Sequence, residues 1–303
     1  MLYQKKIVPF LAVLFLVLLS GCSHRGEPQP VNELRFSLNG ISDVTISYDE
    51  ERITFFEAES DELVLREYMT ENKAAYHAKV DQRGEYLHIS EGGKPVFKES
   101  FNRYIEVYLP ASYQGNLTVT TTDGNIDLSE VPLELSTLCV DSTSGRVEIS
   151  QVSADSIKLS STSGTIDIGQ LNAKRIQLET TSGSISCDSV EGYVVYSSTS
   201  GDLEIKSAAG SGTYKANNSG ELNVTYTMVD NDLYLFNKND TVNLTLPADL
   251  EFRFTATTKN GSVSTTFPES ISINGQITSG SVGLHPTVTI EVETRNGDIQ
   301  VTQ

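Results

Sequence analysis

Four carboxylates recur at one position of a repeated sequence, where they could hold a cation. They lie three residues after a repeated glycine: Asp127, Glu148, Asp167 and Glu204. If neighbouring repeats pair as strands, these side chains are about 4.8 Å apart and repel by about 1 kcal/mol in water. Calcium or a neighbouring lysine would relieve the repulsion. Ser186 and Asn223 interrupt the row, and calcium needs about six to eight converging oxygens. A solvated acidic face is therefore the alternative to a cation ladder.

The sequence shows no signature of catalysis or of cofactor binding. Its histidines have neither ligand nor triad spacing, and no Gly-x-Ser-x-Gly motif or phosphate loop occurs; they are His24, His77, His88 and His285. Polysaccharide lyases and related enzymes also use parallel β-helices, but they build a substrate cleft from long loops. Here the repeats differ in length by only a few residues, so we expect no catalytic residues and no cofactor. A carbohydrate-active enzyme of lyase or hydrolase type remains the alternative.

The carboxylates belong to a sequence that is written four times. Each copy carries Ser/Thr-Thr-Ser-Gly before alternating apolar residues, and its glycines are Gly145, Gly164, Gly183 and Gly201, spaced by 19, 19 and 18 residues. A near-fixed period of this size is typical of a solenoid in which each repeat forms one coil.

Within a coil, apolar residues alternate on both sides of the glycine. They lie seven and five residues before it, as in Ile157 and Leu159, and two and four residues after it, as in Ile166 and Ile168. This spacing predicts strands with one buried face. A third apolar position follows seven residues after the glycine: Val152, Leu171, Val190 and Ala208. We predict an all-β, single-stranded parallel β-solenoid with coils of about 19 residues. We expect the glycine to adopt a positive φ and the Ser and Thr residues to make turn hydrogen bonds.

The repeat extends in both directions from these four copies. Further joints are expected at Gly124, Gly220, Asn239-Asp240, Gly261, Gly280 and Gly297. In this order the strand at 298–302 is the last coil, and Val282, Leu284, Ile299 and Val301 form the core beneath it. An exposed parallel edge is a template for association. We therefore expect self-association or partner docking at the C-terminal coil.

The chain begins with a targeting segment. Residues 1–22 contain Lys5 and Lys6, an apolar run and then Leu19-Ser-Gly-Cys22, which describes a secretory signal peptide. The end of this segment resembles the lipobox of bacterial lipoproteins, and the resemblance implies a lipid on Cys22. Residues 23–30 are interpreted as a linker, 31–110 as an irregular N-terminal β cap with irregular coils, and 111–303 as the regular solenoid.

Charge and cysteine content limit the partners. The net charge of −18 becomes −20 when Lys5 and Lys6 leave with the signal peptide, which argues against nucleic acid and against adhesion of the rod to anionic lipid. With Cys22 lipidated, Cys139 and Cys187 remain. The first is expected to point outward and the second inward, two coils away, so we predict that they do not pair.

Several segments resemble the DUF4097 family. They are residues 105–110 (IEVYLP), 117–126 (LTVTTTDGNI), 246–263 (LPADLEFRFTATTKNGSV), 279–283 (SGSVG) and 293–301 (ETRNGDIQV). The resemblance implies a bacterial cell-envelope β-solenoid, regarded by inference as an adhesin and sometimes associated with envelope-stress loci, without recognised catalytic residues. We therefore expect a non-catalytic protein that is anchored outside the cytoplasmic membrane through Cys22 and presents a rigid surface to an envelope protein or glycan.

Overall fold

The computed structural model describes residues 29–96, 101–267 and 272–303. The predicted signal peptide and Cys22 lie outside these residues. Strand β1 begins at Gln29, inside the segment expected to be a linker.

Within the described residues the fold consists of strands and one 3₁₀ turn, η1 (Ala74–Tyr76). The strands are β1 Gln29–Ser37, β2 Asp43–Ser47, β3 Arg52–Glu57, β4 Glu62–Met69, β5 Lys79–Arg83, β6 Tyr86–Ser90, β7 Arg103–Leu109, β8 Asn116–Thr121, β9 Ile126–Leu128, β10 Leu133–Ser142, β11 Val147–Ser161, β12 Ile166–Thr180, β13 Ile185–Ser198, β14 Leu203–Ala216, β15 Leu222–Asn237, β16 Val242–Thr245, β17 Phe252–Thr258, β18 Val263–Thr265, β19 Ser272–Asn274, β20 Ile277–Val282, β21 Val288–Thr294 and β22 Ile299–Thr302.

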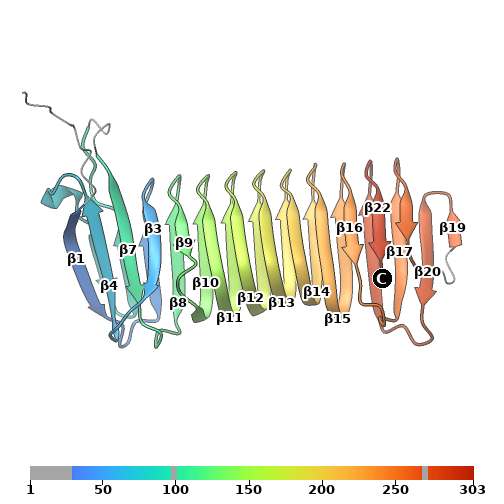
Figure 1. Cartoon of the computed structure of the whole chain (residues 1–303), viewed down its shortest axis with the longest axis horizontal. Helices are drawn as coiled ribbons and strands as arrows, with labels where there is room; N and C mark the ends of the chain where they lie inside the picture. Colours follow the sequence, from blue (N-terminus) through green and yellow to red (C-terminus); the bar gives the residue numbers. More distant parts are fainter. Residues whose placement is uncertain (1–28, 97–100, 268–271) are drawn as a thin grey trace, which may run out of the picture.

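The middle of the chain is a regular parallel β-solenoid, as predicted. Strands β11 and β12 pair in parallel with a constant offset of 19 residues, from Val147 opposite Ile166 to Ser161 opposite Thr180. Figure 1 shows such strands side by side along a rod, closed by narrow loops at the upper edge. Each coil from β11 to β14 is one continuous strand of 14 or 15 residues rather than the two short strands expected.

The inward positions are the predicted ones. Ile166 and Ile168 expose 0% and 4% of their surface, whereas Thr165 is exposed. The third apolar position is also buried, with Val152 and Leu171 at 0%. Full burial of such a side chain stabilises the fold by about 1.5–3 kcal/mol, so the alternating pattern explains why successive coils stack.

A buried hydroxyl residue lies three residues before each of the four repeated glycines. The N–H of Gly164 donates to Ser161 Oγ at 2.9 Å, and the N–H of Gly183 donates to Thr180 Oγ1 at 2.8 Å. Both hydroxyl residues are buried. The Ser/Thr-rich tract is therefore turn chemistry, as predicted, and its first residue makes the hydrogen bond.

The expected reason for most of the repeated glycines was wrong. Among those of the column, Gly220 has a positive φ of 109°, but Gly145, Gly164 and Gly183 do not lie in the left-handed region. Instead, the carbonyl oxygen of the glycine one coil earlier occupies the space that a Cβ would need. Glycine is required because the stacked turns approach one another closely.

At the N-terminal end the coils do not follow chain order. Strand β2 lies between β6 and β8, and β3 lies between β7 and β9, all in parallel. The coil β2–β3 is thus inserted between two coils that come later in the sequence. Beyond β7 the direction changes, because β4 pairs antiparallel with β7 and β1 pairs antiparallel with β4.

The C-terminal end repeats this arrangement and corrects a prediction. Strand β21 lies between β15 and β17, and β22 lies between β16 and β18. The coil β21–β22 is therefore interior, as Figure 1 shows, and not an exposed edge. The edge argument for self-association at this coil was wrong.

The end of the rod is built by other residues. Strand β20 pairs antiparallel with β17, and β19 pairs antiparallel with β20. Gly280 lies within β20 and is not a turn between coils. Leu284, which was expected in the core, is 86% exposed. Antiparallel strands thus interrupt the parallel stack at both ends.

Candidate functional site

The predicted acidic side chains do form a row, but two of them pair with an arginine. Register places Glu148 between Asp127 and Asp167, and Ser186 separates Asp167 from Glu204. Arg146 lies 2.9 Å from Glu148 and 3.1 Å from Asp167. Asp127 accepts hydrogen bonds from the N–H and hydroxyl of Ser129.

These contacts bear on calcium binding. A guanidinium at this distance lowers the repulsion between two adjacent carboxylates. No cluster of three or more His, Cys, Asp or Glu side chains suited to a metal occurs in the described ranges. The row is a half-exposed, partly neutralised face of the rod.

A shallow groove follows the turns of the central coils and is lined by hydroxyl and carboxylate groups. We call it the hydroxyl groove. It has a volume of about 270 Å³ and is lined by Asp141, Ser160, Ser161, Thr162, Glu179, Thr180, Thr181, Ser197, Ser198, Thr199 and Asn217. Ser160 Oγ donates to Asp141 at 2.8 Å, and Lys158 pairs with Glu179 at 3.1 Å. Stacking thus converts the repeated Ser-Thr-Ser sequence into rows of hydrogen-bonding groups.

Sequence reasoning missed a cluster of charges at the N-terminal end, the N-terminal ion cluster of Glu51, Glu91, Lys94 and Arg103. Arg103 has no exposed side-chain surface and lies 2.8 Å from Glu51 and 3.3 Å from Glu91. Lys94 lies 3.1 Å from Glu91 and 3.3 Å from Glu51. Arg103 also donates to the carbonyl of Tyr76 at 2.8 Å.

The pKa values of the two glutamates diverge within this cluster. Burial opposes ionisation of Glu51, but its hydrogen bond with Glu91 and the charges of Arg103 and Lys94 outweigh burial and lower its pKa. Burial and the neighbouring Glu51 raise the pKa of Glu91. Such a pair resembles an acid and base in a catalytic site. Here the charges pair with each other, and Arg103 holds the segments around Tyr76 and Gly93 against β7.

A second buried carboxylate stands beside the cluster. Glu67 is 0% exposed and accepts hydrogen bonds from the Tyr48 hydroxyl at 3.2 Å, Asn32 Nδ2 at 2.7 Å and the Ala78 N–H at 2.7 Å. Burial, then the charge of Glu67, raises the pKa of Tyr48. A sequence signal for these residues existed, because Glu67 and Arg103 occupy inward positions of alternating strands, where a charge requires a partner.

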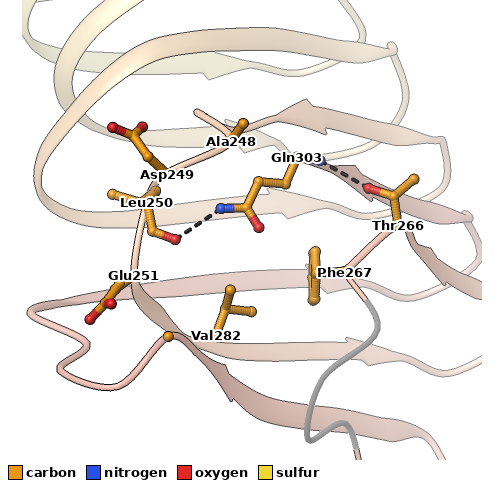
Figure 2. A pocket seen from close by; sticks show the side chains of 9 residues that line it. Ala248, Asp249, Leu250, Glu251, Thr266, Phe267, Val282 and Gln303 are labelled. Carbon is orange, nitrogen blue, oxygen red and sulfur yellow. Dashed lines mark hydrogen bonds between the residues drawn. The ribbon is translucent and has the colours of Figure 1, made fainter.

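The C-terminal end contains a pocket of about 390 Å³ (Figure 2). The side-chain Nε2 of Gln303 donates to the carbonyl oxygens of Leu250 and Pro247, both at 2.9 Å. The backbone N–H of Gln303 donates to Thr266 Oγ1 at 3.0 Å. Figure 2 shows Val282 and Phe267 below the Gln303 amide. The amide is committed to backbone carbonyls, so it ties the turn around Leu250 to β22.

The remaining histidines and cysteines lie apart. His77 contacts Asn72 at 2.9 Å, His88 contacts Ser47 at 3.3 Å, and His285 lies in the loop that follows β20. His24 lies outside the described residues. Cys139 and Cys187 are both free, as predicted, and burial raises the pKa of the Cys187 thiol to about 12.

Comparisons with solved structures return proteins regarded as adhesins. One is a proposed cell-adhesion protein from Clostridium sporogenes, which is 15% identical in sequence. The alignment covers 91% of this chain and 100% of that protein, and the TM-score is 0.32. A proposed adhesin from Bacteroides fragilis shares 12% identity over 89% and 96% of the two chains, with a TM-score of 0.44. One from Parabacteroides distasonis shares 13% identity over the same fractions, also with a TM-score of 0.44.

None of the curated proteins matches the sequence. Across the described residues, no helix has both the length and the apolar character that spanning a membrane requires. The model of the Toastrack DUF4097 family matches residues 41–302, a range that begins just before β2 and ends at the last residue of β22. The chain therefore belongs to the Toastrack DUF4097 family, as the repeated motifs predicted.

Proposed function

We propose that this protein is a non-catalytic binding protein of the bacterial envelope that presents a rigid β-solenoid surface to a glycan or to another envelope protein. The observation that carries this proposal is the conversion of a sequence repeat into rows of polar side chains. Ser160, Glu179 and Ser197 belong to successive strands in one register. A ligand that extends along the rod meets similar hydrogen-bonding groups at each coil.

The rod is suited to presentation rather than to closure around a substrate. Its coils are joined by short turns, and continuous parallel hydrogen bonding links β10 to β15. The hydroxyl groove is shallow and open along the stack. Groups of this kind give specificity through many modest hydrogen bonds, each contributing about 0.5–1.5 kcal/mol.

Membrane attachment through Cys22 forms part of the proposal. Residues 23–28 separate Cys22 from β1 and reach about 20 Å when extended. Two or three acyl chains would hold the protein durably, since each buried methylene contributes about 0.8 kcal/mol. The N-terminal cap would then lie near the membrane, and β17 to β20 would lie at the far end of the rod (Figure 1). Roles linked to envelope stress are compatible with this arrangement.

A glycan array combined with a turnover assay on the same polymers tests the proposal. We expect saturable binding without product formation, and we expect Thr162→Lys with Thr181→Lys in the hydroxyl groove to weaken it. Turnover that depends on one acidic or basic side chain would select the carbohydrate-active enzyme instead. Thr165→Lys with Ser184→Lys, at exposed positions of the same coils outside the groove, adds the same charge and is the control.

A further inference from the structure

A row of basic side chains forms where the inserted coil enters the stack. Lys238, Arg295 and Lys259 each lie two residues before the turn position held by Asp240, Gly297 and Gly261. The N–H of Arg295 donates to the Lys238 carbonyl at 3.2 Å, and the N–H of Asn260 donates to the Arg295 carbonyl at 2.8 Å. The three residues therefore occupy consecutive coils, in the spatial order 238, 295, 259. We call them the basic turn row.

The basic turn row lacks the counter-charges found elsewhere on the rod. Several exposed basic residues of the central coils pair with carboxylates, as Lys174 does with Asp155 and Lys206 with Asp188, whereas Arg175 and Lys215 lie over tyrosine rings. Within the described part of the chain, no ion pair involves Lys238, Arg295 or Lys259. Three stacked positive charges repel one another. The protein has a net charge of −18, so a local group of three positive charges differs from the surface as a whole.

The carboxylates beside the turns serve other contacts, and Glu293, two residues before Arg295, interacts with Tyr234. Asp240 accepts the Thr241 N–H at 2.9 Å, and Asp298 accepts the Ser262 N–H at 2.7 Å and the Ser262 hydroxyl at 2.9 Å. These hydrogen bonds lower the pKa of Asp298 and direct its charge toward Ser262. Among the described residues, neither aspartate forms an ion pair with a residue of the basic turn row.

An asparagine ladder runs beside the basic turn row and adds hydrogen-bond donors. Asn260 Nδ2 donates to Asn296 Oδ1 at 2.8 Å, Asn296 to Asn239 at 2.6 Å, and Asn239 to Asn218 at 3.3 Å. Each amide nitrogen carries two N–H groups, and the ladder uses one. The second N–H of each exposed amide remains for an acceptor outside the rod.

We propose that the basic turn row and the asparagine ladder bind a linear polyanion, a polymer with closely spaced phosphate or carboxylate groups. Cations about 4.8 Å apart along the stack, with amide donors beside them, match an acceptor-rich chain lying along the rod. Arg295, at the centre, can make bidentate contacts with either anion. The neighbouring strands β16, β22 and β17 lie toward the end of the rod opposite β1, with β20 and β19 beyond them (Figure 1). This inference narrows the proposed function to one class of ligand. It rests on the proposed function for the location of the protein in the envelope.

Binding of the mature chain to polyphosphate and to polygalacturonate, with neutral dextran as a third probe, tests the inference. We expect binding to at least one polyanion that weakens with salt, and no binding to dextran through this surface. Arg295→Glu should weaken binding at least about tenfold, and each lost cation should reduce the salt slope by about one. The two polyanions distinguish a phosphate polymer from an acidic glycan as the source of the ligand.

Lys174→Glu is the matched control, because it changes net charge by the same amount at an exposed residue, 83% accessible, of another surface. We expect this variant to bind like the wild type, and thermal unfolding verifies that every variant is folded. Equal losses in both variants, or no polyanion binding by the wild type, would overturn the inference. Self-association abolished by Arg295→Glu would assign the surface to a second copy instead. If Arg295→Glu still binds a neutral glycan and the wild type binds no polyanion, the proposed function stands and the polyanion is excluded as its ligand.

Discussion

The carbonyl oxygen of Gly145 occupies the place where a Cβ on Gly164 would lie, well inside 3.0 Å. The same relationship recurs from Gly124 to Gly220, and it continues through Asp240 to Gly297 and Gly261. A column of backbone contacts therefore runs along the rod and records the spatial order of the coils, including the insertion of the last one.

Gly164→Ala is expected to destabilise the protein by about 1–3 kcal/mol, the usual cost of overpacking, because the neighbouring atom is backbone and cannot rotate away. Thr165→Ala, one residue later and exposed, should change stability by less than about 0.5 kcal/mol. Urea denaturation followed by circular dichroism measures both. Equal stability of the two variants would show that the column tolerates a side chain.

The inward parity of the coils makes neighbouring residues unequal. Ile166→Ala or Ile168→Ala should cost about 2–5 kcal/mol, because each leaves a cavity in the axial core. Asp167→Ala, at the half-exposed position between them, should cost much less, since surface ion pairs contribute about 0–1 kcal/mol. Denaturant midpoints compare the three variants, and similar losses at all of them would contradict the assigned register.

The insertion of β22 between β16 and β18 can be tested by cross-linking. Gln300 is the register partner of both Asn243 and Ser264, so Asn243→Cys with Gln300→Cys should form a disulfide, for which Cα atoms must lie about 4.4–6.8 Å apart. Asn243→Cys with Ser264→Cys should not, because a coil separates them. The measurement is electrophoresis after oxidation, in a chain with Cys139 and Cys187 replaced by Ala. Chain-order stacking would give the opposite pattern.

The N-terminal ion cluster should make stability depend on acid pH. The pKa of Glu51 is lowered from 4.5 in the fold, so its stabilisation is present above pH 4.5 and is lost as the pH falls below that value. The pKa of Glu91 is raised in the fold. Its ionisation therefore lowers the stability of the fold as the pH rises, which is the opposite of the effect of Glu51. Glu51→Gln should therefore lower stability at neutral pH and flatten the decline below pH 4.5.

Glu134→Gln supplies the control for the acid titration, since Glu134 is exposed. Urea midpoints measured from neutral to acid pH should follow the wild type in this variant. An unchanged acid slope in Glu51→Gln would mean that the buried pair does not govern acid unfolding.

Lipid attachment predicts that Cys22→Ala moves the protein from the membrane fraction to the soluble fraction, because the anchoring methylenes are lost. Membrane fractionation with immunodetection checks the result. Cys139→Ala, which changes a half-buried cysteine of the rod, should leave the distribution unchanged. Retention of Cys22→Ala on membranes would contradict the anchor.

The sequence alone determined the repeating unit of this protein. Residues such as Ile166, Ile168 and Leu171 recur at fixed distances from the glycine, and a period of 19 residues with inward alternation leaves a parallel solenoid as the fold that buries them. The turn hydroxyls of Ser161 and Thr180 were also predictable, because a buried turn must satisfy its backbone N–H groups.

Only the tertiary structure decided which coil lies on which. Every coil presents nearly the same inward pattern, so the sequence cannot distinguish stacking of β22 on β16 from stacking in chain order. Strand β20 pairs antiparallel with one edge of β17, and β4 pairs antiparallel with one edge of β7. The other edge of β17 and of β7 is then left for the inserted strands β21 and β3. The Arg103–Glu51 pair and the row formed by Lys238, Arg295 and Lys259 follow from that order, since strands distant in sequence become neighbours.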